Sequence, residues 1–165
     1  MHAASARFHA AALERGFDAN IKEFEQPTRT AQEAADAIGC DVGQIVKSLC
    51  FSVNGAPVMA LVSGANQLDT RKLAALCGVG RKKVKRADAD FVREATGFAI
   101  GGVPPFGHTS QMAIYVDGDL MGYEVVWAAA GTPNAVFPIE PQALVELTGG
   151  VVADLRVEEQ AGSVA

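Results

Sequence analysis

The sequence predicts a mixed α+β fold with short helices, and three observations lead to this prediction. Strand-like and helix-like segments alternate irregularly along the chain, which argues against a doubly wound parallel sheet. Two strand-like segments flank Asn54-Gly55, a strong signal for a two-residue β-hairpin turn. The length of 165 residues suits one domain that buries its own core, so we expect residues 1–165 to form a single domain.

Capping residues mark the helices in the first half of the chain. Thr30 can begin a helix because Glu33, three residues on, completes a capping box, and Gly39 can end it. Asp69 and Gly78 bound a second helix in the same way. In chain order, these signals and the hydrophobic periodicity predict a helix at 4–15, a strand at 17–24, a helix at 31–38, strands at 44–53 and 56–62, and a helix at 70–76.

The second half of the chain is more irregular. A glycine- and proline-rich loop divides it, and Pro141 suits the first turn of a helix. The patterns predict an extended segment at 81–86, a helix at 88–95, the loop at 101–107, strands at 112–116, 124–129 and 135–137, a helix at 141–147 and a last strand at 151–155. We expect the small, polar tail at 158–165 to fray.

Composition bounds the function classes. The three cysteines, Cys40, Cys50 and Cys77, have no zinc-binding spacing with one another or with the histidines, so no metal is expected. Neither a secretion signal nor an apolar stretch of the roughly 20 residues that a spanning helix needs is present. We therefore expect a cytoplasmic protein with no membrane partner.

Positive charge is concentrated in one segment of this acidic chain. The net charge is −5, yet seven of the 14 basic residues lie between positions 71 and 86. Two interpretations remain open: a contact surface for a phosphate backbone, or a solvated face. The seven residues are Arg71, Lys72, Arg81, Lys82, Lys83, Lys85 and Arg86.

Lys47 is anomalous within its predicted strand. By strand alternation it shares a face with Ile45, Leu49 and Phe51, while the opposite face is also largely apolar. A lysine in such a strand must either reach an edge of the sheet or meet an anion. Both interpretations remain open from the strand pattern alone.

Two turns could also carry chemistry. Backbone N–H groups near Gly101 and Gly102 could hold a carbonyl oxygen as it becomes an oxyanion, although a purely structural turn is the alternative. His108 follows this loop, and Gly131-Thr132-Pro133-Asn134 forms a further turn. No nucleophile elbow, phosphate-binding loop or dinucleotide fingerprint is present.

Taken together, these motifs resemble the YbaK/EbsC family and the editing domain inserted in bacterial prolyl-tRNA synthetases. The lysine strand and the glycine loop make the resemblance specific, and the matching pieces span about the middle two-thirds of the chain. They are Ile45-Val46-Lys47-Ser48-Leu49, Ser63-Gly64, Leu68-Asp69-Thr70-Arg71-Lys72-Leu73, Thr96-Gly97 and Gly101-Gly102-Val103-Pro104-Pro105-Phe106-Gly107.

The resemblance implies a barrel-like mixed sheet and a trans-editing hydrolase that cleaves the ester of a mischarged aminoacyl-tRNA, of the Cys-tRNA(Pro) or Ala-tRNA(Pro) type. It implies no cofactor, and as partners it implies the acceptor end of the tRNA and an aminoacyl-tRNA synthetase. Related members often carry a histidine where this chain has Asn134. The expected site comprises Lys47, Gly101 and Gly102 as catalytic residues, Phe106, Gly107, His108, Gly131 and Asn134 at the substrate, and Arg81, Lys82, Lys83, Lys85 and Arg86 at the tRNA.

An aminoacyl ester is reactive enough that positioning and oxyanion stabilisation could suffice without a nucleophilic side chain. On this hypothesis Lys47 holds the substrate end by a phosphate or carbonyl, and the 101–107 loop lies beside Lys47 in one pocket. Two other classes remain: a tRNA-binding or other nucleic-acid-binding module without catalysis, and a protein-interaction domain derived from an editing ancestor.

Overall fold

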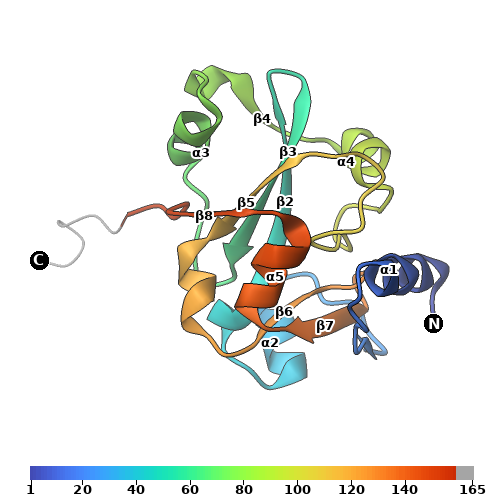
Figure 1. Cartoon of the computed structure of the whole chain (residues 1–165). Helices are drawn as coiled ribbons and strands as arrows, with labels where there is room; N and C mark the ends of the chain where they lie inside the picture. The colour runs from blue at the N-terminus through green and yellow to red at the C-terminus, as the bar shows by residue number, and fades with distance from the viewer. Residues whose placement is uncertain (159–165) are drawn as a thin grey trace, which may run out of the picture.

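A mixed sheet of eight strands forms the centre of the structure, a computed structural model that describes residues 1–158 (Figure 1). The strand order is β1-β7-β6-β2-β3-β5-β8, and β4 pairs with β2 off this path. Within residues 1–158 the sheet is open, because its end strands β1 and β8 each pair with one neighbour and not with each other. The strands are β1 (Lys22–Glu23), β2 (Ile45–Val53), β3 (Ala56–Ser63), β4 (Val84–Arg86), β5 (Ala113–Asp117), β6 (Val126–Ala129), β7 (Ala135–Ile139) and β8 (Val151–Ala153).

Short helices flank this sheet, so the predicted α+β class with flanking helices is confirmed. The helices are α1 (Ala3–Glu14), α2 (Ala31–Ile38), α3 (Thr70–Cys77), α4 (Ala89–Thr96) and α5 (Pro141–Thr148). Within residues 1–158 the structure also has three 3₁₀ turns that the sequence did not predict: η1 (Val42–Gln44) before β2, η2 (Arg81–Lys83) before β4, and η3 (Gly118–Gly122) between β5 and β6.

The predicted helix starts and the hairpin turn are confirmed in atomic detail. The Thr30 hydroxyl accepts a hydrogen bond from the Glu33 amide at 3.0 Å, although the Glu33 carboxylate binds the amide of Arg29 and not that of Thr30. Asn54 and Gly55 have φ angles of 53° and 87°. Positive φ at both positions is what a type I′ turn requires, so β2 and β3 leave this turn in register.

The β2–β3 hairpin is packed on both faces. One face, which includes Val46 and Met59, joins a core cluster with residues of α1, α4 and α5. The other face, which includes Phe51 and Val62, packs with Leu73 of α3. A central strand buried on both sides explains why Lys47 stands out in the sequence.

Two predicted segments differ from the structure. Only residues 22–23 of the predicted strand at 17–24 pair with another strand, because Phe17 packs its ring on the aromatic core instead. The segment at 81–86 is extended only from Val84, since the Lys83 amide closes a tight turn onto the Gly80 carbonyl at 2.9 Å.

The C-terminal end is ordered as far as the structure describes it. Glu158, which we expected to fray, binds the Lys72 amine at 2.7 Å. The rest of the predicted frayed tail, 159–165, lies outside the described residues.

Candidate active site

The main cavity lies against β2 and has a volume of about 380 Å³. Its walls come from the start of α2, the end of β4, the 100–103 segment and the turn before β7. Small side chains dominate its lining, and no aspartate or glutamate is among the lining residues. The alanines that line it are Ala31, Ala34, Ala87, Ala128, Ala129 and Ala135.

An open strand edge borders this cavity. β3 pairs with β2 along residues 46–53, but on its other side β2 pairs with β6 only at residues 45–46 and with β4 only at residues 51–53. Residues 47–50 therefore have no strand partner on that side among the described residues. At the end of this stretch, the Cys50 carbonyl accepts a hydrogen bond from the Ala87 amide at 3.3 Å.

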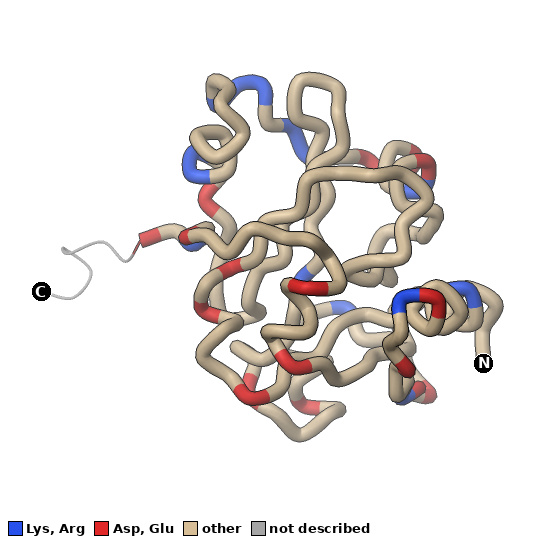
Figure 2. Tube along the Cα trace, viewed as in Figure 1, with Lys and Arg blue, Asp and Glu red and all other residues tan. Residues whose placement is uncertain are grey.

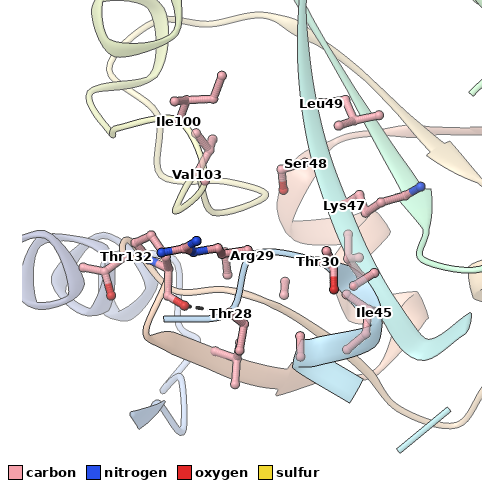
Figure 3. Close-up of a pocket in the computed structure, with 18 of the residues that line it drawn as sticks. Thr28, Arg29, Thr30, Ile45, Lys47, Ser48, Leu49, Ile100, Val103 and Thr132 are labelled. Atoms are coloured by element: carbon pink, nitrogen blue, oxygen red, sulfur yellow. Dashed lines mark hydrogen bonds between the residues drawn. The ribbon is translucent and has the colours of Figure 1, made fainter. Parts of the chain in front are cut away.

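Lys47 lies at this open edge, but its amine points away from the main cavity. In Figure 3, Ser48 extends toward Val103 and Ile100, whereas Lys47 extends to the opposite side of β2. The Lys47 Nζ donates a hydrogen bond to the main-chain oxygen of Asn66. We expected the 101–107 loop to lie beside Lys47. Lys47 and Gly101 do line the same cavity, but the Lys47 amine lies on the other side of β2.

The amine instead borders a second depression, which we call the side hollow. It also has a volume of about 380 Å³ and shares Lys47, Leu49 and Arg86 with the main cavity. Its other lining residues are Phe51, Gln67, Leu68, Thr70 and Val84. Burial lowers the pKa of Lys47 from its ordinary value, the charge of Asp117 opposes this shift, and the charge of Arg86 adds to it.

The two predicted catalytic glycines have different environments. Gly101 is exposed, lines the main cavity and has φ of 94°, and its amide makes no hydrogen bond within the described chain. The buried Gly102 amide is already bonded to the Ala99 carbonyl at 3.1 Å, so it is not available as an oxyanion donor in this arrangement. Of the pair, only Gly101 therefore offers an N–H group at the cavity.

Phe106, Gly107 and His108 are not brought to the main cavity. The Phe106 ring is 1% exposed and packs in an aromatic cluster that includes Phe8, at a ring distance of 5.2 Å. Gly107 lies under α1, and a side-chain carbon added there would stand 3.3 Å from Ala11. His108 binds the Pro104 carbonyl through Nε2 at 2.6 Å, and burial lowers its pKa. These positions have packing roles, and the predicted direct substrate contacts by them have no support in the geometry.

Gly131 and Asn134 likewise stand behind the cavity wall. A side-chain carbon at Gly131 would meet the Ala4 backbone at 2.8 Å, so this glycine permits close packing against α1. The Asn134 carboxamide donates to the Phe24 carbonyl at 3.2 Å. It fastens the turn to the segment that follows β1, while its neighbours Thr132 and Pro133 provide the cavity wall.

Several cavity residues were missed by sequence reasoning. Arg29 and Thr30 line the cavity from the N-terminus of α2. Ser48, the residue after Lys47 on β2, extends toward the 100–103 segment. The Ser48 hydroxyl is buried without a hydrogen-bond partner in the described chain. The capping box located the start of α2 correctly, but no sequence signal placed that helix end opposite β2.

The basic segment forms an exposed surface on one side of the fold. Figure 2 shows Lys and Arg gathered between α3 and β4. Lys72 belongs to the fold itself, because its amine binds Asp154 and Glu158 at 2.8 and 2.7 Å. Within residues 1–158, no ion pair involves the remaining exposed cations of η2 and β4: Arg81, Lys82, Lys83, Lys85 and Arg86.

An open-edged strand with a half-buried lysine, a glycine loop and an exposed cationic segment define a site suited to an anionic substrate. Comparisons with known proteins identify the class. The family model of the aminoacyl-tRNA editing domain matches residues 25–147. This chain therefore belongs to the aminoacyl-tRNA editing domain family, and its activity is that of an aminoacyl-tRNA deacylase.

Relatives and solved structures agree with this assignment. EbsC from Enterococcus faecalis, whose name proposes a Cys-tRNA(Pro)/Cys-tRNA(Cys) deacylase, is 30% identical over 143 residues, covering 84% of this chain and 86% of EbsC. Proline–tRNA ligase from Maridesulfovibrio salexigens is 34% identical over 110 residues, which are 66% of this chain and 18% of the ligase. A crystal structure described as a proposed trans-editing enzyme for prolyl-tRNA synthetase superposes with a TM-score of 0.91 at 46% identity, covering 96% of this chain and 99% of the other.

Across residues 1–158, no helix is long and apolar enough to cross a membrane. In the same range, no group of three or more His, Cys, Asp or Glu side chains is arranged to hold a metal ion.

Proposed function

We propose that this deacylase acts in trans on the acceptor end of a mischarged tRNA, with the aminoacyl group in the main cavity. The observation that carries this proposal is the convergence of Lys47, Gly101 and the open edge of β2 on adjoining hollows of an editing fold. The two hollows share three residues, so one bound ligand can occupy both sides of this edge.

The reaction is a hydrolysis that needs orientation more than a nucleophilic side chain. Water adds to the ester carbonyl carbon and the carbonyl oxygen becomes an oxyanion. The bond to the ribose oxygen then breaks as that oxygen takes up the proton that the attacking water loses. The Gly101 amide is the N–H group at the cavity that can stabilise the oxyanion. A neighbouring hydroxyl of the terminal ribose orients the water.

Lys47 holds the anionic part of the substrate end from the side hollow. Its amine stands on the same side of the open edge as Arg86, so two cations face the region where a phosphate would enter. From there the tRNA continues onto the exposed cations of η2 and β4, which contact the acceptor stem. Removing the lysine should therefore weaken the attraction of the anionic substrate end and disturb the alignment of the ester in the cavity.

The cavity favours a small amino acid. Six of its 24 lining residues are alanines, and no carboxylate among them could attract a long cationic side chain. Cysteine and alanine esters both fit these limits, and of the two it is the cysteine ester that the name of EbsC proposes. The similarity to proline–tRNA ligases supports a proline tRNA as the carrier and a synthetase as an associated partner. These substrates are found in the cytoplasm, where we place the protein.

The decisive experiment is a deacylation assay across a panel of mischarged tRNAs, with the parent, Lys47→Ala and Lys22→Ala. Lys22 is an exposed lysine of β1 that lines neither hollow, so its variant controls for loss of charge. We expect the parent and Lys22→Ala to cleave small aminoacyl esters, and folded Lys47→Ala to be slower by about 10²-fold or more. Equal turnover by Lys47→Ala would show that the lysine is structural, and tRNA binding without cleavage by the parent would favour a non-catalytic module.

A further inference from the structure

A buried carboxylate lies behind Lys47 without a cation of its own. Asp117, the last residue of β5, is 2% exposed. Its Oδ2 accepts the Ser63 amide at 3.0 Å and the Asn66 carboxamide at 2.9 Å, and its Oδ1 accepts the Asp119 amide at 3.0 Å. All three donors are neutral, and no ion pair forms at Asp117 within the described chain. Burying a carboxylate in this way is costly, so a fold that keeps one there calls for a physical reason.

Asn66 connects this carboxylate to the lysine. Its main-chain oxygen accepts the Lys47 amine, while its carboxamide donates to Asp117. The same carboxamide also donates to Asp119 at 2.8 Å. One residue of the turn after β3 thus holds an ammonium group with its backbone and a buried carboxylate with its side chain.

The charges around Lys47 come from three elements. Asp117 of β5 favours the ammonium form, and Arg86 of β4 disfavours it. Asp119 of η3 is about half exposed, with 46% of its side-chain surface accessible, and its charge is compensated by Arg156 at 3.1 Å. Asp117 is therefore the one uncompensated anion in this set.

We propose that Asp117 is a positioning residue for the deacylation reaction: through Asn66 it holds the Lys47 ammonium group at the open edge of β2 and supplies its counter-charge. This inference rests on the proposed role of Lys47 at the substrate. Asp117 itself does not touch the substrate, because it lines neither hollow.

Opposite pH shifts follow from the two neighbouring charges. Burial already lowers the pKa of Lys47, and Asp117 limits that fall. Asp117→Asn removes the attraction, so the pKa of Lys47 falls further and the alkaline limb of kcat/KM moves to lower pH. Arg86→Gln removes a repulsion, so the same limb moves to higher pH even though overall activity drops. Asp119→Asn should leave the limb close to the parent's, because the charge of Asp119 is compensated by Arg156.

The experiment measures kcat/KM for a small aminoacyl ester of tRNA against pH for these variants, with spontaneous ester hydrolysis subtracted. The ¹³Cε resonance of Lys47, assigned with Lys47→Arg, is titrated by NMR in parallel without substrate. An asparagine at 117 offers one acceptor oxygen where the carboxylate offers two, so folding is checked by circular dichroism. If that variant does not fold, Asn66→Ala takes its place: it removes the side-chain link to Asp117 but keeps the charge of Asp117, so kcat/KM should fall while the Lys47 titration stays close to the parent's, and an unchanged kcat/KM would overturn the positioning role of that link.

Each outcome decides between the two proposals. Downward shifts in both readouts for Asp117→Asn, with an upward shift for Arg86→Gln, support the positioning role. A folded Asp117→Asn protein with the parent's alkaline limb and the parent's Lys47 titration overturns it. A parent that cleaves no ester contradicts the proposed function instead, and the NMR titration then still decides whether Asp117 controls the lysine.

Discussion

The Gly131 amide donates a hydrogen bond to the Gly102 carbonyl at 3.0 Å, which fastens the turn before β7 to the glycine loop. The contact is so close that a side-chain carbon at Gly102 would lie 2.6 Å from the Thr132 Cα atom. Both segments line the main cavity, through Gly101 on one side and through Thr132 on the other. The shape of the cavity therefore depends on a glycine that does not itself line the cavity.

Gly102→Ala should damage both folding and activity. The added methyl group meets backbone atoms that cannot move cheaply, so we expect a loss of about 1–3 kcal/mol in the free energy of unfolding. The displaced turn should also lower deacylation. Gly80→Ala is the matched control, since nothing lies within 4 Å of a side-chain carbon there and its φ is −68°. Urea unfolding and single-turnover assays compare the two, and equal stabilities would contradict the packing argument.

Phe106→Ala should act through the core and not through substrate choice. The ring packs against Phe8, Phe17 and Phe137, so we expect a destabilisation of about 3–5 kcal/mol. Phe106→Leu keeps much of the volume and should recover most of that loss. In folded Phe106→Leu the ratio of rates for two different aminoacyl esters should equal the parent's. A changed ratio of rates would show that Phe106 influences substrate choice and would contradict the packing role.

His108 should make the fold less stable in mild acid. Burial lowers its pKa in the folded protein, while in the unfolded chain the pKa returns to about 6.5. Below that pH the unfolded state binds more protons, so the free energy of unfolding decreases as pH falls through this window. His108→Gln retains an amide donor for the Pro104 carbonyl and should lose less stability between pH 7.5 and 5.5. Identical losses in urea unfolding at the two pH values would contradict this assignment.

Local signals in the sequence predicted most elements correctly, because caps and turns depend on nearby residues. Thr30, Asp69 and the Asn54-Gly55 turn act within three residues of the features that they specify. The prediction of a fully extended segment at 81–86 was wrong because no local residue signals the tight turn at η2, which can precede a strand without a distinctive residue.

The site was harder to predict because strand alternation assigns faces but not neighbours. It placed Lys47 with Leu49 and opposite Ser48, as the structure has them. Strand alternation could not show that the glycine loop packs over the Ser48 face, because that contact depends on the tertiary positions of α4 and of the turn before β7. The proximity of Phe106 to Gly101 in the sequence also suggested a shared role, but the chain turns inward at Val103 and buries the ring.

Reversing the charges of Lys82, Lys83 and Lys85 to Glu should weaken tRNA binding and flatten its salt dependence. All three side chains are exposed, and each lost phosphate contact lowers the slope of log affinity against log salt by about 0.7–0.9. Lys83 lies in η2 and Lys85 in β4, so no shared strand face couples them and we expect their effects to add.

Single variants Lys83→Glu and Arg93→Glu make a matched pair, because Arg93 is an exposed cation of α4 outside this segment. Filter binding at several salt concentrations should separate them, with only Lys83→Glu lowering the slope. If the triple variant binds with the parent's affinity and slope, the segment only keeps the edge strand β4 soluble, and the acceptor stem must contact another surface.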